Sequence, residues 1–402
     1  MDFSFTEEDE AFRDELRGWL DSQLPPFLEQ WNRDDGVSVA SDFNRSQERR
    51  RDWQRRLNEG RWAAINWPLA WNGREATPVQ NAVYAEEMAR VRAPGLYNPN
   101  GIWQIGPMIL QWGTSEQQQL WLPSILTATD HWCQGFSEPD AGSDLANIAT
   151  TAIADGDSYV INGQKTWISS AHLATWGLFL LRTDPTAIRR GAKHEGITAF
   201  ILNLKTPGIQ CSSIRDMTND TMLNDVYFTD VRIPQSYRLG EEGQGWSVAM
   251  STLGHERVGT AGLSVTMAGD LKALISLARS HNPDALRDPA LRHRIGRLHA
   301  EIELTRLLNY RALTKIVKGQ PNWPEVPLAK LQWSSISQSL AELAIDVLGP
   351  AGLLGPNAPG AIDNGSWVRN YAWQRYTSIG AGATEIQKNI IAKKAMKLAA
   401  SR

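Results

Sequence analysis

The sequence has 402 residues, which is enough chain for two or three domains, and a balanced net charge of −3. Such a charge argues against a nucleic-acid-binding surface. No apolar run approaches the length of a membrane-spanning helix, which is about 20 residues. The acidic N-terminus lacks the pattern of a signal peptide, and two lone cysteines, Cys133 and Cys211, fit a reducing compartment. We therefore expect a cytoplasmic protein that binds neither nucleic acid nor a membrane.

The first third of the chain predicts helices. Apolar residues recur at helical spacing over 8–20, 43–60, 77–92 and 115–122. Thr77 followed by Pro78 is typical of an N-cap and a first helical residue. Because proline lacks an amide hydrogen, Pro25-Pro26 and Pro123 are expected to end the first and last of these helices.

The pattern changes near Trp132. Alternating residues from Thr150 to Ile161 around Asp155-Gly156-Asp157 predict a hairpin, and further short strands are expected over 177–183, 198–204, 209–215 and 225–231. Strands without intervening helices indicate a small antiparallel sandwich or barrel. After Gly245 long helices return, over 246–280, 288–318, 326–348 and 384–400.

Two segments of the middle region could bind a ligand. Residues 135–144 (Gly-Phe-Ser-Glu-Pro-Asp-Ala-Gly-Ser-Asp) are small and carry the hydroxyls of Ser137 and Ser143, although an ordinary surface turn would look the same. In 162–170, an Asn-Gly hairpin turn is expected to lead into a strand. There Trp167 and Ser169 would share a face that suits a planar ring with a polar edge; a core tryptophan beside a solvated serine is the alternative.

Two further segments lie in the last third. In 253–262, Glu256 stands among small residues, where a carboxylate could face a ligand and act as a general base, or simply pair with an arginine. Residues 379–387 (Ile-Gly-Ala-Gly-Ala-Thr-Glu-Ile-Gln) form a glycine-rich loop before a helix, with Thr384 near the cap. Amides at such a position bind anions or carbonyl oxygens, or serve only to cap the helix.

In this order and spacing, the four segments resemble those of the acyl-CoA dehydrogenase family over essentially the full length of the chain. The resemblance implies an α+β fold with an N-terminal helical domain over 1–128, a middle antiparallel β-domain over 129–238 and a C-terminal four-helix bundle over 239–402. The segment 132–172 is especially similar to actinobacterial members that act on steroid-derived CoA thioesters.

The resemblance also implies an FAD cofactor and assigns roles. The amides of Phe136 and Ser137 would bind the isoalloxazine, Trp167 would stack near it and Ser169 would reach its reactive nitrogen. The remaining cofactor contacts would come from Ser143, Ala383, Thr384 and Glu385. The acyl-CoA would contact Ser143, Gly254, Arg257 and Gly382.

The catalytic base is implied by a departure from the commonest pattern. Many members carry the base in the C-terminal loop, where this chain has Ala381, whereas isovaleryl- and long-chain-type members carry a glutamate where this chain has Glu256. Glu256 would take the α-proton, the amide of Ala381 would hold the thioester oxygen and the flavin would receive the β-hydride, giving a trans-2-enoyl-CoA. Electrons would leave to an electron-transfer flavoprotein.

Alternatives stay open. An acyl-CoA oxidase passing electrons to oxygen would share this machinery, and a non-catalytic flavin-binding partner subunit would be expected to lack Glu256. A metal site is not expected, because His293 and His299 are not at i, i+4 spacing.

The chain also departs from the family where homomeric relatives hold a neighbour's flavin. No Phe-Gly follows Arg279, and Asp346 and Pro350 stand where a glutamine and a glycine are expected. A homo-oligomer with altered contacts and an α2β2 heteromer, in which a second chain supplies those contacts, are both compatible with this.

Overall fold

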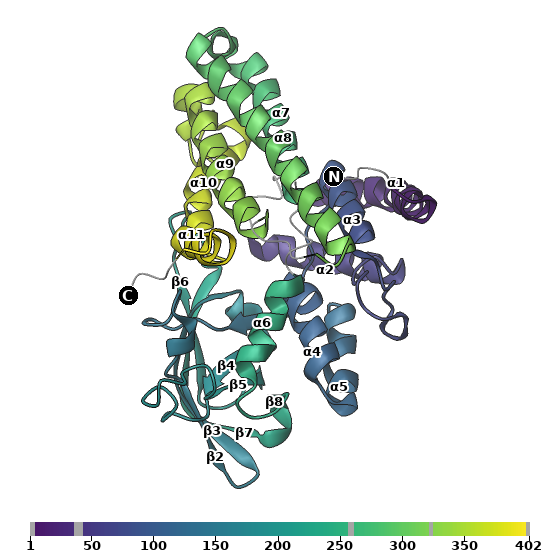
Figure 1. The fold of residues 1–402 in the computed structure, drawn as a ribbon. Coiled ribbons are helices and arrows are strands. Elements are labelled where there is room, and N and C mark those ends of the chain that lie inside the picture. Colours follow the sequence, from purple (N-terminus) through teal and green to yellow (C-terminus); the bar gives the residue numbers. More distant parts are fainter. Residues whose placement is uncertain (1–4, 36–42, 256–260, 321–324, 399–402) are drawn as a thin grey trace. The chain divides into compact units, whose positions relative to one another are not determined.

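The structure, a computed structural model, describes residues 5–35, 43–255, 261–320 and 325–398 (Figure 1). The chain divides into two compact units. The helical unit comprises Met1–Ser46, Ala76–Pro94 and Arg257–Arg402, and the β-unit comprises Gln47–Glu75 and Gly95–Glu256. No helix in the described ranges is long and apolar enough to cross a membrane.

The β-unit is built on a sheet of eight strands in its described part, in the order β6-β7-β3-β2-β4-β5-β8 with β1 beside β4. Neighbours along this order run antiparallel except β2 and β4, and β1 is also parallel to β4. The strands are β1 Trp132–Gly135, β2 Thr151–Asp155, β3 Ser158–Ser169, β4 Trp176–Arg182, β5 Ile197–Asn203, β6 Ile209–Ile214, β7 Leu223–Pro234 and β8 Arg238–Leu239.

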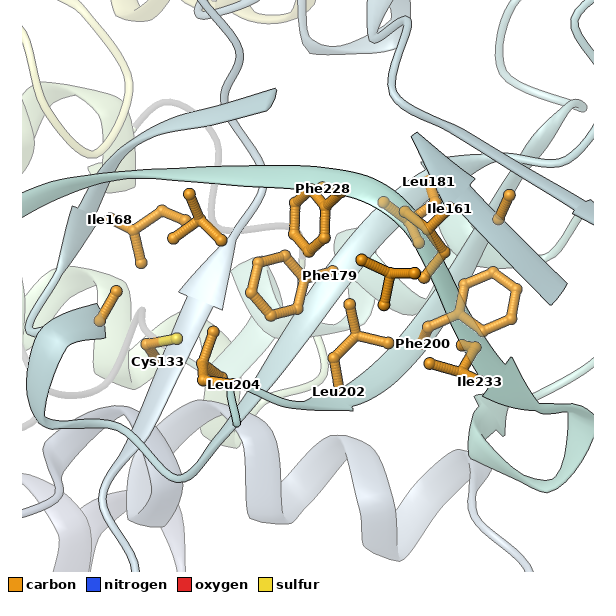
Figure 2. Packing of buried hydrophobic residues seen from close by; sticks show 14 of the residues in the cluster. Cys133, Ile161, Ile168, Phe179, Leu181, Phe200, Leu202, Leu204, Phe228 and Ile233 are labelled. Atoms are coloured by element: carbon orange, nitrogen blue, oxygen red, sulfur yellow. The ribbon is translucent and has the colours of Figure 1, made fainter. Parts of the chain in front are cut away.

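The core of this sheet is apolar and aromatic. Phe179 and Phe228 meet edge to face with ring centroids 5.5 Å apart, and Figure 2 shows Leu202, Phe200 and Ile233 in the same cluster. A second aromatic group joins α5 to the sheet and consists of Trp121, Trp132, Trp176 and Tyr237. Burial of this aromatic and aliphatic surface stabilises the unit.

Helices complete the β-unit: most of α2 (Phe43–Glu59), α4 Gly106–Trp112, α5 Ser115–Leu126, α6 Gly245–His255, a π-turn over Gly101–Ile105, and short 3₁₀ turns over Leu69–Trp71, Leu145–Asn147, Ala171–Leu173 and Gln235–Tyr237. A buried amide pair ties them together. Gln54 Oε1 accepts from the amide of Asn98 (2.9 Å), and Gln54 Nε2 donates to the carbonyl of Ile125 (2.9 Å). Asn98 Oδ1 accepts from the amides of Gly101 (3.1 Å) and Trp132 (3.2 Å), which fixes the start of β1.

The helical unit contains α1 Glu7–Asp35, α3 Pro78–Arg90, α7 Ala261–His281, α8 Pro289–Val317, α9 Glu325–Leu348, α10 Ser366–Trp373 and α11 Thr384–Ile390, with short turns over Pro283–Leu286, Gly349–Leu353, Ile362–Gly365, Gln374–Ser378 and Ile391–Ala395. Helices α7, α8 and α9 lie side by side in Figure 1 around a core that includes Leu274, Leu298 and Leu343. Thr77 forms a capping box with Gln80 at the start of α3, as expected from the sequence.

Three expectations about local structure are wrong. Pro25 and Pro26 lie inside α1, because its apolar face continues past them to the buried Phe27; Pro123 lies inside α5 for the same reason, before the buried Ile125. Asn162-Gly163 is not a hairpin turn but an irregularity within β3, where Gly163 has φ 141°. The last helix ends at Ile390 and continues only as the π-turn, well before residue 400.

Candidate functional site

The loop after β1 presents free amides. The carbonyl of Ser137 accepts from the amide of Thr166 (3.0 Å), and the carbonyl of Phe136 accepts from Lys165 Nζ (3.0 Å). The amides of Phe136 and Ser137 themselves donate to no acceptor in the described part of the chain. A half-buried pair of unpaired amides is costly unless a ligand or water accepts from it, so this loop is suited to bind a polar ring edge.

Beneath this loop lies a buried ion pair. Lys165 is fully buried, and its Nζ is 2.7 Å from Glu138 Oε1. The carboxylate of Glu138 also accepts from the amides of Ala149 (2.7 Å) and Thr150 (3.0 Å). Burial lowers the pKa of Lys165 to about 8, although the charge of Glu138 opposes the shift. Burial raises the pKa of Glu138, but the charge of Lys165 and these hydrogen bonds outweigh it, and the net pKa lies below its usual value.

Trp167 is held in an unusual backbone conformation. Its φ is 60°, in the left-handed region, and the pairing of β3 with β7 shifts register between Lys165 and Ile168. The side chain is 60% exposed although Thr166 and Ile168 on either side are buried. For a bulky residue this conformation costs about 1–3 kcal/mol, which is typical of sites where function dictates geometry.

Ser169 is half-buried, two residues beyond Trp167. Regular alternation along β3 was expected to place Trp167 and Ser169 on one face. The bulge between Lys165 and Ile168 interrupts that alternation, so alternation alone does not determine where the two side chains lie. Ser143 is exposed in the turn after this loop, where its neighbour Asp144 pairs with Lys193 (2.7 Å). Of the remaining predicted residues, Gly254 lies near the end of α6, and Glu256 and Arg257 lie outside the described residues.

The second predicted group lies in the helical unit. Ala381 (φ 52°) and Gly382 (φ 86°) both have left-handed backbones and are exposed, and Ala383 holds the N-cap position of α11. Thr384 is the first helical residue rather than the cap, and its hydroxyl donates to the carbonyl of Ser378 (3.3 Å). Glu385 is exposed in the first turn.

A polar stripe on α9 anchors this loop. Ser334 Oγ donates to the carbonyl of Thr377 (2.8 Å), and Lys330 Nζ donates to the same oxygen. Gln338 Nε2 donates to the hydroxyls of Thr377 (3.3 Å) and Ser378 (3.2 Å). The sequence analysis did not predict these tethers, although Lys330, Ser334 and Gln338 recur at i, i+4 and i+8 and so lie along one side of the helix.

We expect Ala381→Val to destabilise the protein by about 1–2 kcal/mol, because a β-branched side chain is strained at positive φ. Ala381→Gly tolerates this conformation and should leave stability near or above that of the wild type. Thermal unfolding of the variants measures both effects. A valine variant as stable as the glycine variant would contradict the left-handed conformation of this residue.

Family models match nearly the whole chain. The N-terminal domain of acyl-CoA dehydrogenases matches residues 6–129, the middle domain 133–231 and the C-terminal domain 243–396. The chain belongs to the acyl-CoA dehydrogenase family. This confirms the expected family and fold class, and it makes the chain an oxidoreductase that dehydrogenates acyl-CoA thioesters.

Individual members of the acyl-CoA dehydrogenase family are also similar. Acyl-CoA dehydrogenase IpdE1 of Mycobacterium tuberculosis is 37% identical over 390 residues, covering 97% of each chain. A solved structure titled as the Tcur3481-Tcur3483 steroid ACAD has a TM-score of 0.84 at 28% identity, with 100% of both chains covered. The ChsE4-ChsE5 complex from Mycobacterium tuberculosis has a TM-score of 0.81 at 28% identity, again over 100% of both chains.

Proposed function

We propose that this acyl-CoA dehydrogenase binds FAD at the loop after β1. The free amides of Phe136 and Ser137 support this proposal most directly, because they match the polar edge of an isoalloxazine. Trp167 offers an exposed aromatic side chain near this loop, because the amide of its neighbour Thr166 donates to the carbonyl of Ser137. Further contacts are proposed for Ser143, Ser169, Ala383, Thr384 and Glu385.

When bound, FAD supplies the acceptor for a hydride from the β-carbon of the substrate. In the proposed mechanism, Glu256 removes the α-proton and the amide of Ala381 donates to the thioester oxygen, where negative charge develops as the proton leaves. The positive φ of Ala381 and the α9 tethers on the preceding turn support a preorganised loop. Gly254, Arg257 and Gly382 are proposed to contact the acyl-CoA, and the product is a trans-2-enoyl-CoA.

The cofactor proposal is tested by the flavin content of the purified protein. We expect FAD in the complex as isolated, with no other flavin. Well-folded protein that neither carries FAD nor takes it up on reconstitution would contradict it.

Reoxidation of the reduced enzyme distinguishes the two possible electron acceptors. We expect slow reaction with oxygen and fast reaction with an electron-transfer flavoprotein, and the reverse would favour an oxidase.

A steroid-derived CoA thioester is the proposed substrate class. The resemblance of 132–172 to steroid-catabolic members supports it, and so does the similarity to a solved structure titled as a steroid ACAD. Turnover across straight-chain, branched and ring-derived CoA esters tests it, and a clear preference for short straight chains would contradict it.

We further propose a cytoplasmic location and domain boundaries after residues 128 and 238.

We also propose that the chain assembles with a second, different acyl-CoA dehydrogenase-like chain as an α2β2 tetramer. The departures at Arg279 and at Asp346 to Pro350 belong to one patch, since Asn282 Nδ2 donates to the carbonyl of Val347 (2.9 Å). Arg294 is already paired with Asp346 (2.5 Å), and Pro350 has no amide hydrogen. Neither Asp346 nor Pro350 can therefore donate a hydrogen bond to a pyrophosphate. Two similar solved structures have titles that name two chains, which supports the proposal.

Expression of the chain alone should therefore give protein with low flavin occupancy, and co-expression with the partner chain should restore it. The readouts are the ratio of FAD to protein and the mass of the assembly by light scattering. A stable homo-oligomer with one tightly bound FAD per chain and good turnover would contradict the heteromer and leave the proposed cofactor intact.

A further inference from the structure

Lys165 is a charged residue at a buried strand position, where an apolar residue would be expected. Lys165 is on β3, which crosses the core of the β-unit, and its side chain is fully buried. Removing an ammonium group from water is costly, and an apolar residue at a buried strand position is usually at least as stable as a buried ion pair. A requirement other than stability is the simplest reason for a lysine here.

The contacts of Lys165 indicate what that requirement is. Its Nζ binds the carbonyl of Phe136 (3.0 Å) and the carboxylate of Glu138 (2.7 Å), which flank Ser137 on both sides. The next residue of β3, Thr166, binds the carbonyl of Ser137 itself (3.0 Å). Three consecutive residues of the loop are thus fixed from beneath by two consecutive residues of β3, all through oxygen atoms.

This arrangement orients the opposite side of the loop. In an extended segment, fixing the carbonyl oxygens sets the peptide planes, and each peptide plane sets the direction of the amide that follows. The carbonyl of Phe136 shares its peptide plane with the amide of Ser137, and that amide has no acceptor in the described part of the chain. Glu138 is itself anchored from the other side by the amides of Ala149 and Thr150, so the ammonium group bridges two fixed points.

We infer that Lys165 is a positioning residue for the cofactor, which it serves by aiming the amide of Ser137 at the flavin without contacting it. The inference rests on the proposed FAD site. It assigns Glu138 a secondary part: the carboxylate keeps the ammonium group in place, whereas the bond from Lys165 to the carbonyl of Phe136 orients the loop.

Three variants separate positioning from stability. Lys165→Met leaves a buried carboxylate without its cation and the Phe136 carbonyl without its donor, so stability and flavin affinity should both fall. Glu138→Gln should lower stability while keeping the bond to Phe136 and most of the affinity. The double variant Lys165→Met with Glu138→Gln removes both charges of the pair, so stability should recover in part while the affinity stays low.

The measurements are the dissociation of FAD from the holoenzyme, followed by flavin fluorescence on dilution, and the thermal midpoint of the same proteins without flavin. We expect FAD affinity to fall about tenfold to a hundredfold in both variants that lack Lys165, as for the loss of one charge-assisted hydrogen bond. The visible flavin spectrum should shift in the same two variants. Lys193→Met, which removes a partly exposed lysine from its pair with the exposed Asp144, is the control and should change neither measurement.

The outcome that would overturn the inference is an affinity that follows stability in all three variants, with the double variant near the wild type in both. Failure of the proposed cofactor looks different, since the wild-type complex itself would then bind no FAD.

Discussion

Glu256→Gln should slow reduction of the flavin by acyl-CoA by about 10²–10⁴-fold, because the amide cannot accept the α-proton. The FAD content should be unchanged, since no cofactor contact is proposed for this residue. Anaerobic stopped-flow mixing with substrate measures the rate. Because relatives carry the base in either of two places, Ala381→Glu in the same background is expected to restore part of it.

Glu241→Gln is a matched control for the loss of one carboxylate. Glu241 is exposed, pairs with Arg238 (3.1 Å) and precedes α6 in the same unit. Its replacement should leave the reduction rate at the wild-type value. Near-native reduction in Glu256→Gln would show that another group takes the proton and would remove Glu256 from the mechanism.

Trp121→Ala should lower the free energy of unfolding of the β-unit by about 3–5 kcal/mol, the usual cost of emptying a large aromatic site. Trp121 is almost completely buried, and its ring centroid lies 6.4 Å from that of Trp132, 6.0 Å from Trp176 and 5.8 Å from Tyr237. Urea unfolding followed by circular dichroism measures the loss.

Two variants of α5 sharpen this test. The neighbouring Leu120 is 58% exposed, so Leu120→Ala should cost no more than about 0.5 kcal/mol. The buried indole N–H of Trp121 has no acceptor among the described residues, and Trp121→Phe removes it while keeping an aromatic ring, so its cost should be well below that of alanine. Equal losses for alanine at 120 and 121 would contradict the packing of this helix.

The sequence predicted the strands well because β7 largely alternates between buried and exposed residues, and β4 and β5 are short, almost fully buried apolar runs. The hairpin around Gly156 and the strands from β4 to β7 lie within a few residues of their expected places. The proline at 123 misled for a physical reason: the apolar contacts of Ile125 outweigh one lost backbone hydrogen bond, and local propensity does not record such contacts.

The candidate site was predictable only in part. The order of the four sequence segments predicted the family, but it did not predict the hydrogen bonds that fix the loops after β1 and before α11. The left-handed conformations of Trp167 and Ala381 leave no trace in propensity, because neither residue type favours positive φ. Lys165 and Glu138 were visible inside two of the segments, yet a charged residue is expected on the surface, and only the structure shows that they pair in the core.

Anaerobic titration of the flavin-loaded complex with acyl-CoA esters tests most directly whether this chain uses FAD to dehydrogenate an acyl-CoA. The visible flavin absorbance should bleach with a ring-derived CoA thioester, and a trans-2-enoyl-CoA should form in proportion. Flavin that stays oxidised with every straight, branched and ring-derived thioester, although dithionite reduces it, would contradict this activity.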